Sequence, residues 1–284
     1  MLHLARACGY PRATLTLDSR TAPFTLGPPA PAPAGTVLLL HGFTGSPWEV
    51  RPLGESLAAR GFHVEAQLLP GHGATPEAME GLTWRDWVHA ADAALTSAVR
   101  AAGGPVALAG LSMGSLLSLL LASRRPADVT GVVLLAPVVR FRALDARLLR
   151  AVRATPLRRV FPRWVNKRTT DLSLEEERAR APLLPRYPLA RVLDLITLQD
   201  LAWLAAPQVR CPALVVAAAH DHVVALPGVE ELVQRLPAAR LLVLQRGWHI
   251  IPRDADRALA ATEAASFLDA LPRPGARAAA TGPR

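Results

Sequence analysis

Short aliphatic runs alternate with longer helical patterns along most of this 284-residue chain. Most of the runs are apolar on both faces, which is the pattern of strands in a parallel sheet that is buried between helices. Parallel neighbours need a crossover connection, and the helical patterns supply it. The alternation therefore predicts an α/β fold with a mostly parallel, doubly wound sheet. The expected strands are Thr36–Leu40, His63–Leu68, Val106–Ala109, Val132–Ala136, Ala213–Ala218 and Arg240–Leu244, and the expected helices are 48–60, 83–101, 113–124, 227–236 and 255–270.

The alternation stops between residues 138 and 207, where arginine and proline interrupt the sequence and no strand is expected. We interpret residues 138–207 as a helical cap that is inserted into one α/β domain spanning residues 24–271. The flanking segments 1–23 and 272–284 are rich in proline, alanine and arginine, and we expect them to be poorly ordered.

The net charge of +9 is concentrated in the predicted cap. From residue 140 to residue 191 the chain has fourteen basic residues against five acidic ones, which accounts for the whole excess. A regional excess differs from the extended basic field of a nucleic-acid-binding protein, so no nucleic-acid partner is expected.

Residues 144–153 form an amphipathic helical pattern with leucines on one face and arginines on the other. Two interpretations stay open: peripheral contact of the basic cap with anionic membrane, or a solvated face that reflects codon bias.

A serine stands between two glycines in the run Gly110-Leu111-Ser112-Met113-Gly114, directly after an aliphatic run and directly before a helical pattern. This strand–turn–helix setting is typical of a nucleophile elbow, in which the chain bends sharply and presents one hydroxyl group. The glycines relieve the crowding that side chains would cause at such a bend. The pattern makes Ser112 the candidate nucleophile, and an ordinary serine in a tight turn is the simpler alternative.

A serine hydroxyl becomes a nucleophile only when a base takes its proton and an acid orients that base. In the elbow fold the chain order is serine, then acid, then histidine. Five of the eight histidines precede Ser112, His220 precedes the best acid, Asp221, and His222 adjoins that acid in the run HDHVV. The remaining candidate base is His249, in the run RGWHIIP. Both runs follow expected strands, at the edge where α/β sheets place their sites.

The negative charge of a tetrahedral intermediate must be held by backbone N–H groups. The amide of Met113 is one expected donor, because it opens a helix directly after Ser112. The second donor is expected from the run HGFTGSP at residues 41–47, which follows the first core strand. Phe43 is the best placed residue of that run.

The runs TVLLLHGFTGSP, LLPGHG, GLSMG, HDHVV and WHII, in this order, resemble the α/β-hydrolase superfamily over about residues 24–270. HGFTGSP, GLSMG and DHVV together are most similar to bacterial monoacylglycerol lipases and the small carboxylesterases related to them. The resemblance also implies a cap between the strands near residues 136 and 213. One departure is Ser115, where such proteins usually have a further glycine. The roles that the resemblance implies are nucleophile for Ser112, orienting acid for Asp221, base for His249, and backbone oxyanion donors for Phe43 and Met113.

The expected function is hydrolysis of carboxylic esters, either monoacylglycerols or medium-chain acyl esters, through an acyl-enzyme intermediate. Thioesterases, peptidases and acyltransferases use the same three side chains and stay open as alternatives, and so does a non-catalytic ligand-binding protein on the same fold. The expected partner is a small acyl ester, with no cofactor and no metal, because neither the two cysteines nor the paired histidines of HDHVV have a clear further ligand. Without a long apolar run or a secretory signal pattern, a cytoplasmic location is expected.

Overall fold

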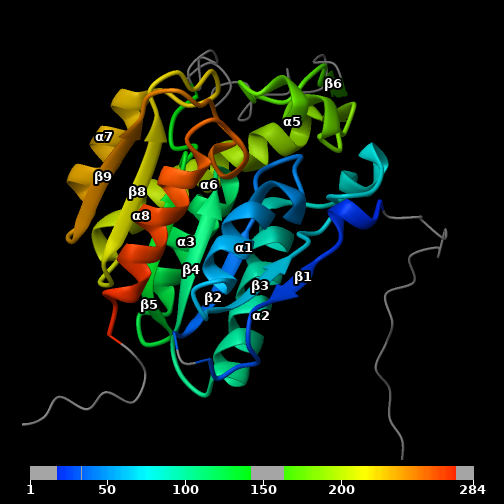
Figure 1. The fold of residues 1–284 in the computed structure, drawn as a ribbon. Coiled ribbons are helices and arrows are strands. Elements are labelled where there is room, and N and C mark those ends of the chain that lie inside the picture. The colour runs from blue at the N-terminus through cyan, green and yellow to red at the C-terminus, as the bar shows by residue number, and fades with distance from the viewer. Residues whose placement is uncertain (1–17, 33, 142–162, 273–284) are drawn as a thin grey trace, which may run out of the picture.

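The computed structural model of the protein describes residues 18–32, 34–141 and 163–272. Its centre is a seven-stranded sheet in the order β1-β3-β2-β4-β5-β8-β9 (Figure 1). All neighbouring strands are parallel except β1, which pairs antiparallel with β3 at the edge. The strands are β1 (Phe24–Leu26), β2 (Thr36–Leu40), β3 (His63–Gln67), β4 (Val106–Leu111), β5 (Val129–Leu135), β8 (Ala213–Ala218) and β9 (Ala239–Leu244).

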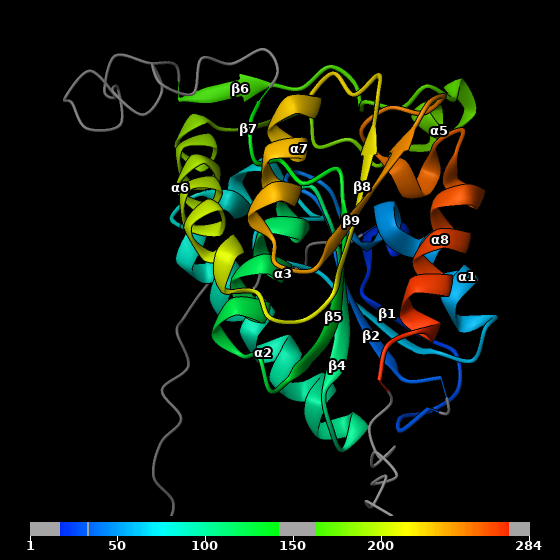
Figure 2. The ribbon, with the colours of Figure 1, turned by 90° about the vertical axis from the view of Figure 1, so that its left-hand side faces the viewer.

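Helices cover both faces of the sheet, as Figure 2 shows edge-on. One face carries α1 and α8, and the other carries α2, α3, α6 and α7, so that two separate apolar layers form. Successive residues of β2 serve different layers, because Val37 and Leu39 pack towards α1 and α8 while Leu38 and Leu40 pack towards α2 and α3. None of the described helices is long and apolar enough to cross a bilayer. The helices are α1 (Arg51–Ala58), α2 (Trp84–Ala102), α3 (Met113–Arg124), α5 (Glu175–Arg180), α6 (Leu189–Ala205), α7 (Leu226–Arg235) and α8 (Arg257–Asp269), and the 3₁₀ helices are Ser19–Thr21, Pro47–Val50, Pro76–Met79, Ala206–Gln208 and Ile251–Arg253.

The sequence explains why the helices begin and end where they do. Helix α2 begins with a capping box, in which the Thr83 side chain accepts from the first turn and the Asp86 side chain accepts from the backbone N–H of Thr83 at 2.7 Å. The same helix ends at Gly103, whose φ of 65° is accessible to glycine at little cost.

The prediction of six core strands and a doubly wound parallel sheet is confirmed.

The first part of the segment between β5 and β8, called the insertion below, lies beyond the carboxyl ends of the sheet strands, while its helix α6 packs on the face of the sheet beside α3 (Figures 1 and 2). Its described part holds α5, α6 and two short strands, β6 (Trp164–Asn166) and β7 (Arg186–Pro188), which pair antiparallel. The expectation that no strand occurs between 138 and 207 was wrong here. Three-residue strands are shorter than the window in which a periodic apolar pattern can be recognised. The amphipathic pattern at 144–153 lies outside the described residues.

Ion pairs join the insertion to the rest of the chain beside the 3₁₀ helix Pro76–Met79. Arg163 contacts Glu80 at 2.6 Å, and Arg186 contacts Glu77 at 2.7 Å. Such exposed pairs contribute at most about 1 kcal/mol each, so they add little to the stability of the docked insertion. At the N-terminal end, residues 19–21 of the expected tail form a 3₁₀ turn in which the Thr21 side chain is buried.

Candidate active site

Ser112 stands at the sharp turn between β4 and α3. Its φ of 55° and ψ of −111° are values that a serine adopts only under strain. The neighbouring glycines permit the turn, because a Cβ at Gly110 would lie 2.2 Å from the carbonyl group of Gly114, and a Cβ at Gly114 would lie 2.0 Å from the carbonyl oxygen of Leu40. The elbow geometry therefore brings β4, α3 and β2 closer together than any side chain at these two positions allows.

Ser115 occupies the position where a further glycine was expected from the resemblance. Its Oγ lies 2.7 Å from the carbonyl oxygen of Gly110 and 3.0 Å from that of Leu135. The residue is fully buried, and its hydroxyl is satisfied by the ends of β4 and β5. A serine thus fits at this position because it bonds to the strands that the helix approaches.

Asp221 and His249 follow β8 and β9, and their side chains form a buried pair. Nδ1 of His249 donates to Oδ2 of Asp221 at 2.8 Å. The other oxygen of Asp221 accepts the N–H groups of Val223 at 2.7 Å and Val224 at 2.8 Å, which fixes the plane of the carboxylate. Because Nδ1 carries the proton, Nε2 of His249 is the ring nitrogen that can act as a base.

The environment shifts the pKa of both groups in the direction that strengthens the pair. Burial works against the charge of Asp221, but His249 and the two backbone N–H groups outweigh it and lower the pKa of Asp221 below its ordinary value. Burial also works against an imidazolium ion, but the carboxylates of Asp221, Asp171 and Glu49 outweigh it and raise the pKa of His249. The site is therefore built to carry a positive charge on His249.

The backbone N–H groups of Phe43 and Met113, the two expected oxyanion donors, have no acceptor among the described residues. A free N–H is ordinary for Met113, which opens α3, but Phe43 lies in a loop where such groups are normally satisfied. The loop is held by Glu49, whose Oε2 accepts from the N–H of Gly42 at 3.0 Å. Phe43 and Met113 can therefore offer donors to a developing negative charge.

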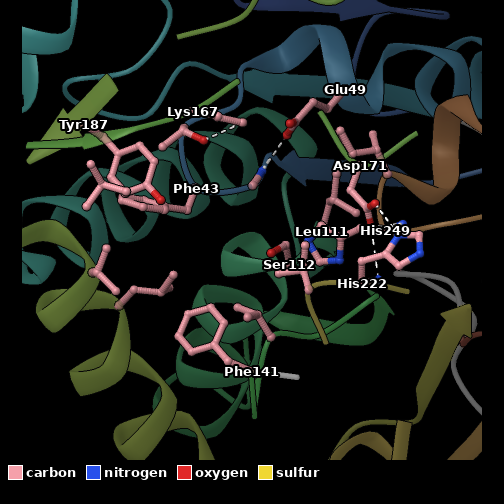
Figure 3. Close-up of a pocket in the computed structure, with 18 of the residues that line it drawn as sticks. Phe43, Glu49, Leu111, Ser112, Phe141, Lys167, Asp171, Tyr187, His222 and His249 are labelled. Carbon is pink, nitrogen blue, oxygen red and sulfur yellow. Dashed lines mark hydrogen bonds and ion pairs between the residues drawn. The ribbon is translucent and has the colours of Figure 1, made fainter. Parts of the chain in front are cut away.

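Ser112 and His249 line the same cavity, which has a volume of about 360 Å³. Figure 3 shows Lys167 and Glu49 on one side of Ser112 and Phe141 on the other. The insertion supplies part of the wall, so the cavity lies between the sheet and the insertion. Its apolar lining comprises Phe43, Leu111, Val138, Phe141, Val165, Leu189, Val192, Leu195, Val223 and Ile250.

The polar side of the cavity is formed by Lys167, Thr44 and Glu49. Lys167 is the only lysine of the sequence, and its Nζ donates to Oγ1 of Thr44 at 2.8 Å. Burial lowers the pKa of Lys167, and the nearby charge of Glu49 opposes this change. Burial likewise raises the pKa of Glu49, while Lys167 and the N–H of Gly42 oppose it. The two groups thus support each other's charge at one end of the cavity.

Sequence reasoning did not identify Glu49, Lys167 or Asp171 as residues of the site. Glu49 is the second residue after the expected oxyanion run, and the single lysine in an arginine-rich chain was the one available signal for Lys167. Asp171 carried no signal, because its contacts depend on how the insertion folds.

In the described part of the chain no cluster of three or more histidine, cysteine, aspartate or glutamate side chains could hold a metal ion.

A strained serine after β4, with an acid and a histidine at the ends of β8 and β9 of a parallel sheet, defines the α/β-hydrolase fold. The chain belongs to the family described as serine aminopeptidase, S33 (Hydrolase_4), whose model matches residues 31–256.

Several known proteins are similar to this chain over most of their length. A thermostable monoacylglycerol lipase of Bacillus sp. (strain H-257) is 29% identical over 82% of this chain and 89% of that protein. A carboxylesterase of Bacillus subtilis (strain 168) is 26% identical over 83% of this chain and 92% of that protein. A solved structure from work on the metagenome-derived lipolytic enzymes LipS and LipT has a TM-score of 0.77 and 28% identity, and it covers 88% of this chain and 98% of that chain.

Proposed function

We propose that this ester hydrolase works through Ser112, His249 and Asp221 and forms an acyl-enzyme intermediate. The observation that carries the proposal is the bond of 2.8 Å between Nδ1 of His249 and Asp221, in a histidine that lines the same cavity as Ser112. This arrangement supplies a base whose proton-accepting nitrogen has no hydrogen-bond partner among the described residues, in the same cavity as a hydroxyl on a strained turn.

In the first half of the reaction Ser112 attacks the ester carbonyl carbon, and its proton passes to Nε2 of His249. The raised pKa of His249 favours this transfer, and the charge of Asp221 stabilises the imidazolium ion. The oxyanion that forms is held by the N–H groups of Phe43 and Met113. Each donor of this kind contributes on the order of 3 kcal/mol to transition-state stabilisation.

In the second half the imidazolium ion of His249 gives its proton to the leaving alcohol, and the acyl group stays on Ser112. A water molecule then loses a proton to Nε2 and attacks the acyl carbonyl. The carboxylic acid leaves, Ser112 recovers its proton, and the cycle closes with no change in the charge of the protein.

The proposed substrates are monoacylglycerols or medium-chain esters of similar polarity, which the lining of the cavity supports. Phe141, Val192 and Leu195 offer an apolar surface to an acyl chain, while Lys167 and Glu49 offer a donor and an acceptor to the hydroxyl groups of the alcohol. An aminopeptidase substrate would bring an ammonium group, which Glu49 would attract but Lys167 would repel. The neutral, hydroxylated alcohol therefore suits this pair better.

The segment 138–207 is proposed to act as a cap, which agrees with the insertion residues in the cavity wall. Membrane contact through its arginines has less support from the structure, because three of the described ones, Arg140, Arg163 and Arg186, pair with glutamates. The cytoplasmic location and the absence of a nucleic-acid partner stay predictions from the sequence.

Hydrolysis of p-nitrophenyl esters of graded chain length, beside 1-monoacylglycerols, tests the proposal. Replacement of Ser112 by alanine is expected to lower kcat by at least about 10⁴-fold, and to abolish labelling by a serine-directed phosphonate. Ser118→Ala is the matched control, because its hydroxyl is buried in α3 and bonds to the carbonyl oxygen of Gly114 at 2.9 Å, away from the cavity. A Ser112→Ala variant that keeps a tenth of the activity would refute the role. Absence of both turnover and labelling in the wild type would favour a ligand-binding protein.

A further inference from the structure

Asp171, a residue of the insertion, touches both loops that carry the proposed acid and base. Its Oδ1 accepts from Nδ1 of His222 at 2.7 Å, and its Oδ2 accepts from the backbone N–H of His222 at 3.2 Å. The same Oδ2 accepts from the backbone N–H of His249 at 3.2 Å. The carbonyl oxygen of Asp171 also accepts from the N–H of Ile250 at 3.3 Å. One residue thus bonds to the neighbour of Asp221 and to His249 itself.

A second carboxylate connects the same two segments, but it belongs to the loop after His249 and its partners belong to the insertion. Asp254, in the loop that follows His249, is buried and accepts from the N–H of Ser173 at 2.9 Å and from the N–H of Leu174 at 3.2 Å, and the hydroxyl of Ser173 bonds to it as well. Asp254 also accepts from the N–H of Trp248 at 2.8 Å. Residues 171–174 and 248–254 are therefore held together from both sides.

Asp171 differs from Asp254 in that its carboxylate also lines the cavity (Figure 3). The charged groups that act on the His249 imidazole are the carboxylates of Asp221, Asp171 and Glu49. His222 lines the same cavity. Its Nδ1 donates to Asp171, which holds this second imidazole in a fixed orientation. Removal of Asp171 would take away a negative charge, two bonds to the acid loop and one to the base loop.

We propose that Asp171 is a positioning residue for ester hydrolysis: it locks the loop of His249 to the loop of Asp221, and its charge stabilises the imidazolium ion that forms. This inference rests on the proposed function, because it assigns Asp171 a role only through His249. The reaction is expected to depend on the correct docking of the insertion even for a substrate too small to touch it.

The variant Asp171→Asn tests the proposal, since asparagine keeps the size of the side chain and loses its charge. With p-nitrophenyl butyrate, kcat is expected to fall about 10-fold while KM stays nearly constant. The acidic limb of the kcat/KM profile is expected to move to lower pH by about half a unit or more, because the imidazolium ion loses a neighbouring negative charge. A residue that only stabilises the fold would not move this limb.

Glu77→Gln is the matched control, because Glu77 also pairs with the insertion, through Arg186 at 2.7 Å, but lies outside the cavity wall. This variant is expected to keep both kcat and the acidic limb of the wild type. Thermal unfolding of each variant shows whether it is folded under the assay conditions. An acidic limb that stays in place in folded Asp171→Asn overturns the proposal, whatever the loss of activity. Failure of the wild type to hydrolyse the ester would instead overturn the proposed function.

Discussion

Replacement of Lys167 by methionine is expected to change which esters the enzyme prefers. The substitution keeps the length of the side chain but removes the ammonium group that donates to Thr44 at 2.8 Å. Lys167 also lowers the pKa of Glu49, so its loss is expected to raise that pKa further and to favour the protonated carboxyl group. Both polar partners of a hydroxylated alcohol are thereby weakened by one change.

The size of the effect follows from the groups involved. A hydrogen bond between a hydroxyl and a charged group contributes about 1.5–3 kcal/mol, which corresponds to about 10- to 150-fold in kcat/KM. The preference for 1-mono-octanoylglycerol over ethyl octanoate is expected to fall by this factor in Lys167→Met. The acyl chain is the same in both substrates, so contacts at the apolar side of the cavity cancel in the ratio.

The assay measures kcat/KM for the two octanoate esters in the wild type, in Lys167→Met and in Thr44→Val. The valine variant removes the acceptor of the Lys167 bond but leaves the ammonium group in the cavity wall, so it is expected to keep most of the preference. A common decrease for both esters in Lys167→Met, with an unchanged ratio, would refute the reasoning. Such a result would mean that Lys167 acts on the oxyanion loop through Glu49 and not on the alcohol.

Three further outcomes follow from the geometry of the elbow and its base. The base must be neutral, so kcat/KM should be lost as the pH falls through the raised pKa of His249; a midpoint of the acidic limb below the ordinary 6.5 contradicts this. Ser115→Ala removes the bond of 2.7 Å to the carbonyl oxygen of Gly110. This variant should lower the free energy of unfolding by about 1–2 kcal/mol with little change in kcat. An unchanged melting temperature would contradict the stabilising role of this hydroxyl. Gly114→Ala places a Cβ 2.0 Å from the carbonyl oxygen of Leu40 and should lower kcat and the rate of phosphonate labelling at least about 100-fold; normal labelling would show that the elbow can relax.

The centre of the sheet could be predicted because β2, β4, β5 and β8 are aliphatic and almost wholly buried. The strand β1 escaped prediction, since its three residues are only partly buried and lie at the sheet edge. The strands β6 and β7 were also not predicted, because each has only three residues. They pair across nineteen intervening residues (167–185) that show no periodic pattern. Short edge pairing is decided by tertiary contacts rather than by local sequence.

The candidate triad could be placed because each member follows a recognisable strand. Ser112 has its own local pattern. Chain order left His222 and His249, and the adjacency of His222 to Asp221 left His249 as the partner of that acid. The electrostatic interaction of Glu49 with Lys167 and the bond of Asp171 to His249 join residues that are far apart in sequence, and they exist only once the insertion has docked on the sheet. No periodicity or spacing encodes such docking, so these residues required the structure.

Lys167 also gives the protein an unusual spectroscopic property. Reductive methylation with ¹³C-formaldehyde would introduce a single side-chain dimethylamine, because the chain has one lysine. This methyl signal would originate in the wall of the cavity that holds Ser112. Its chemical shift would report ionisation and occupancy of that cavity in real time, without interference from any other labelled side chain.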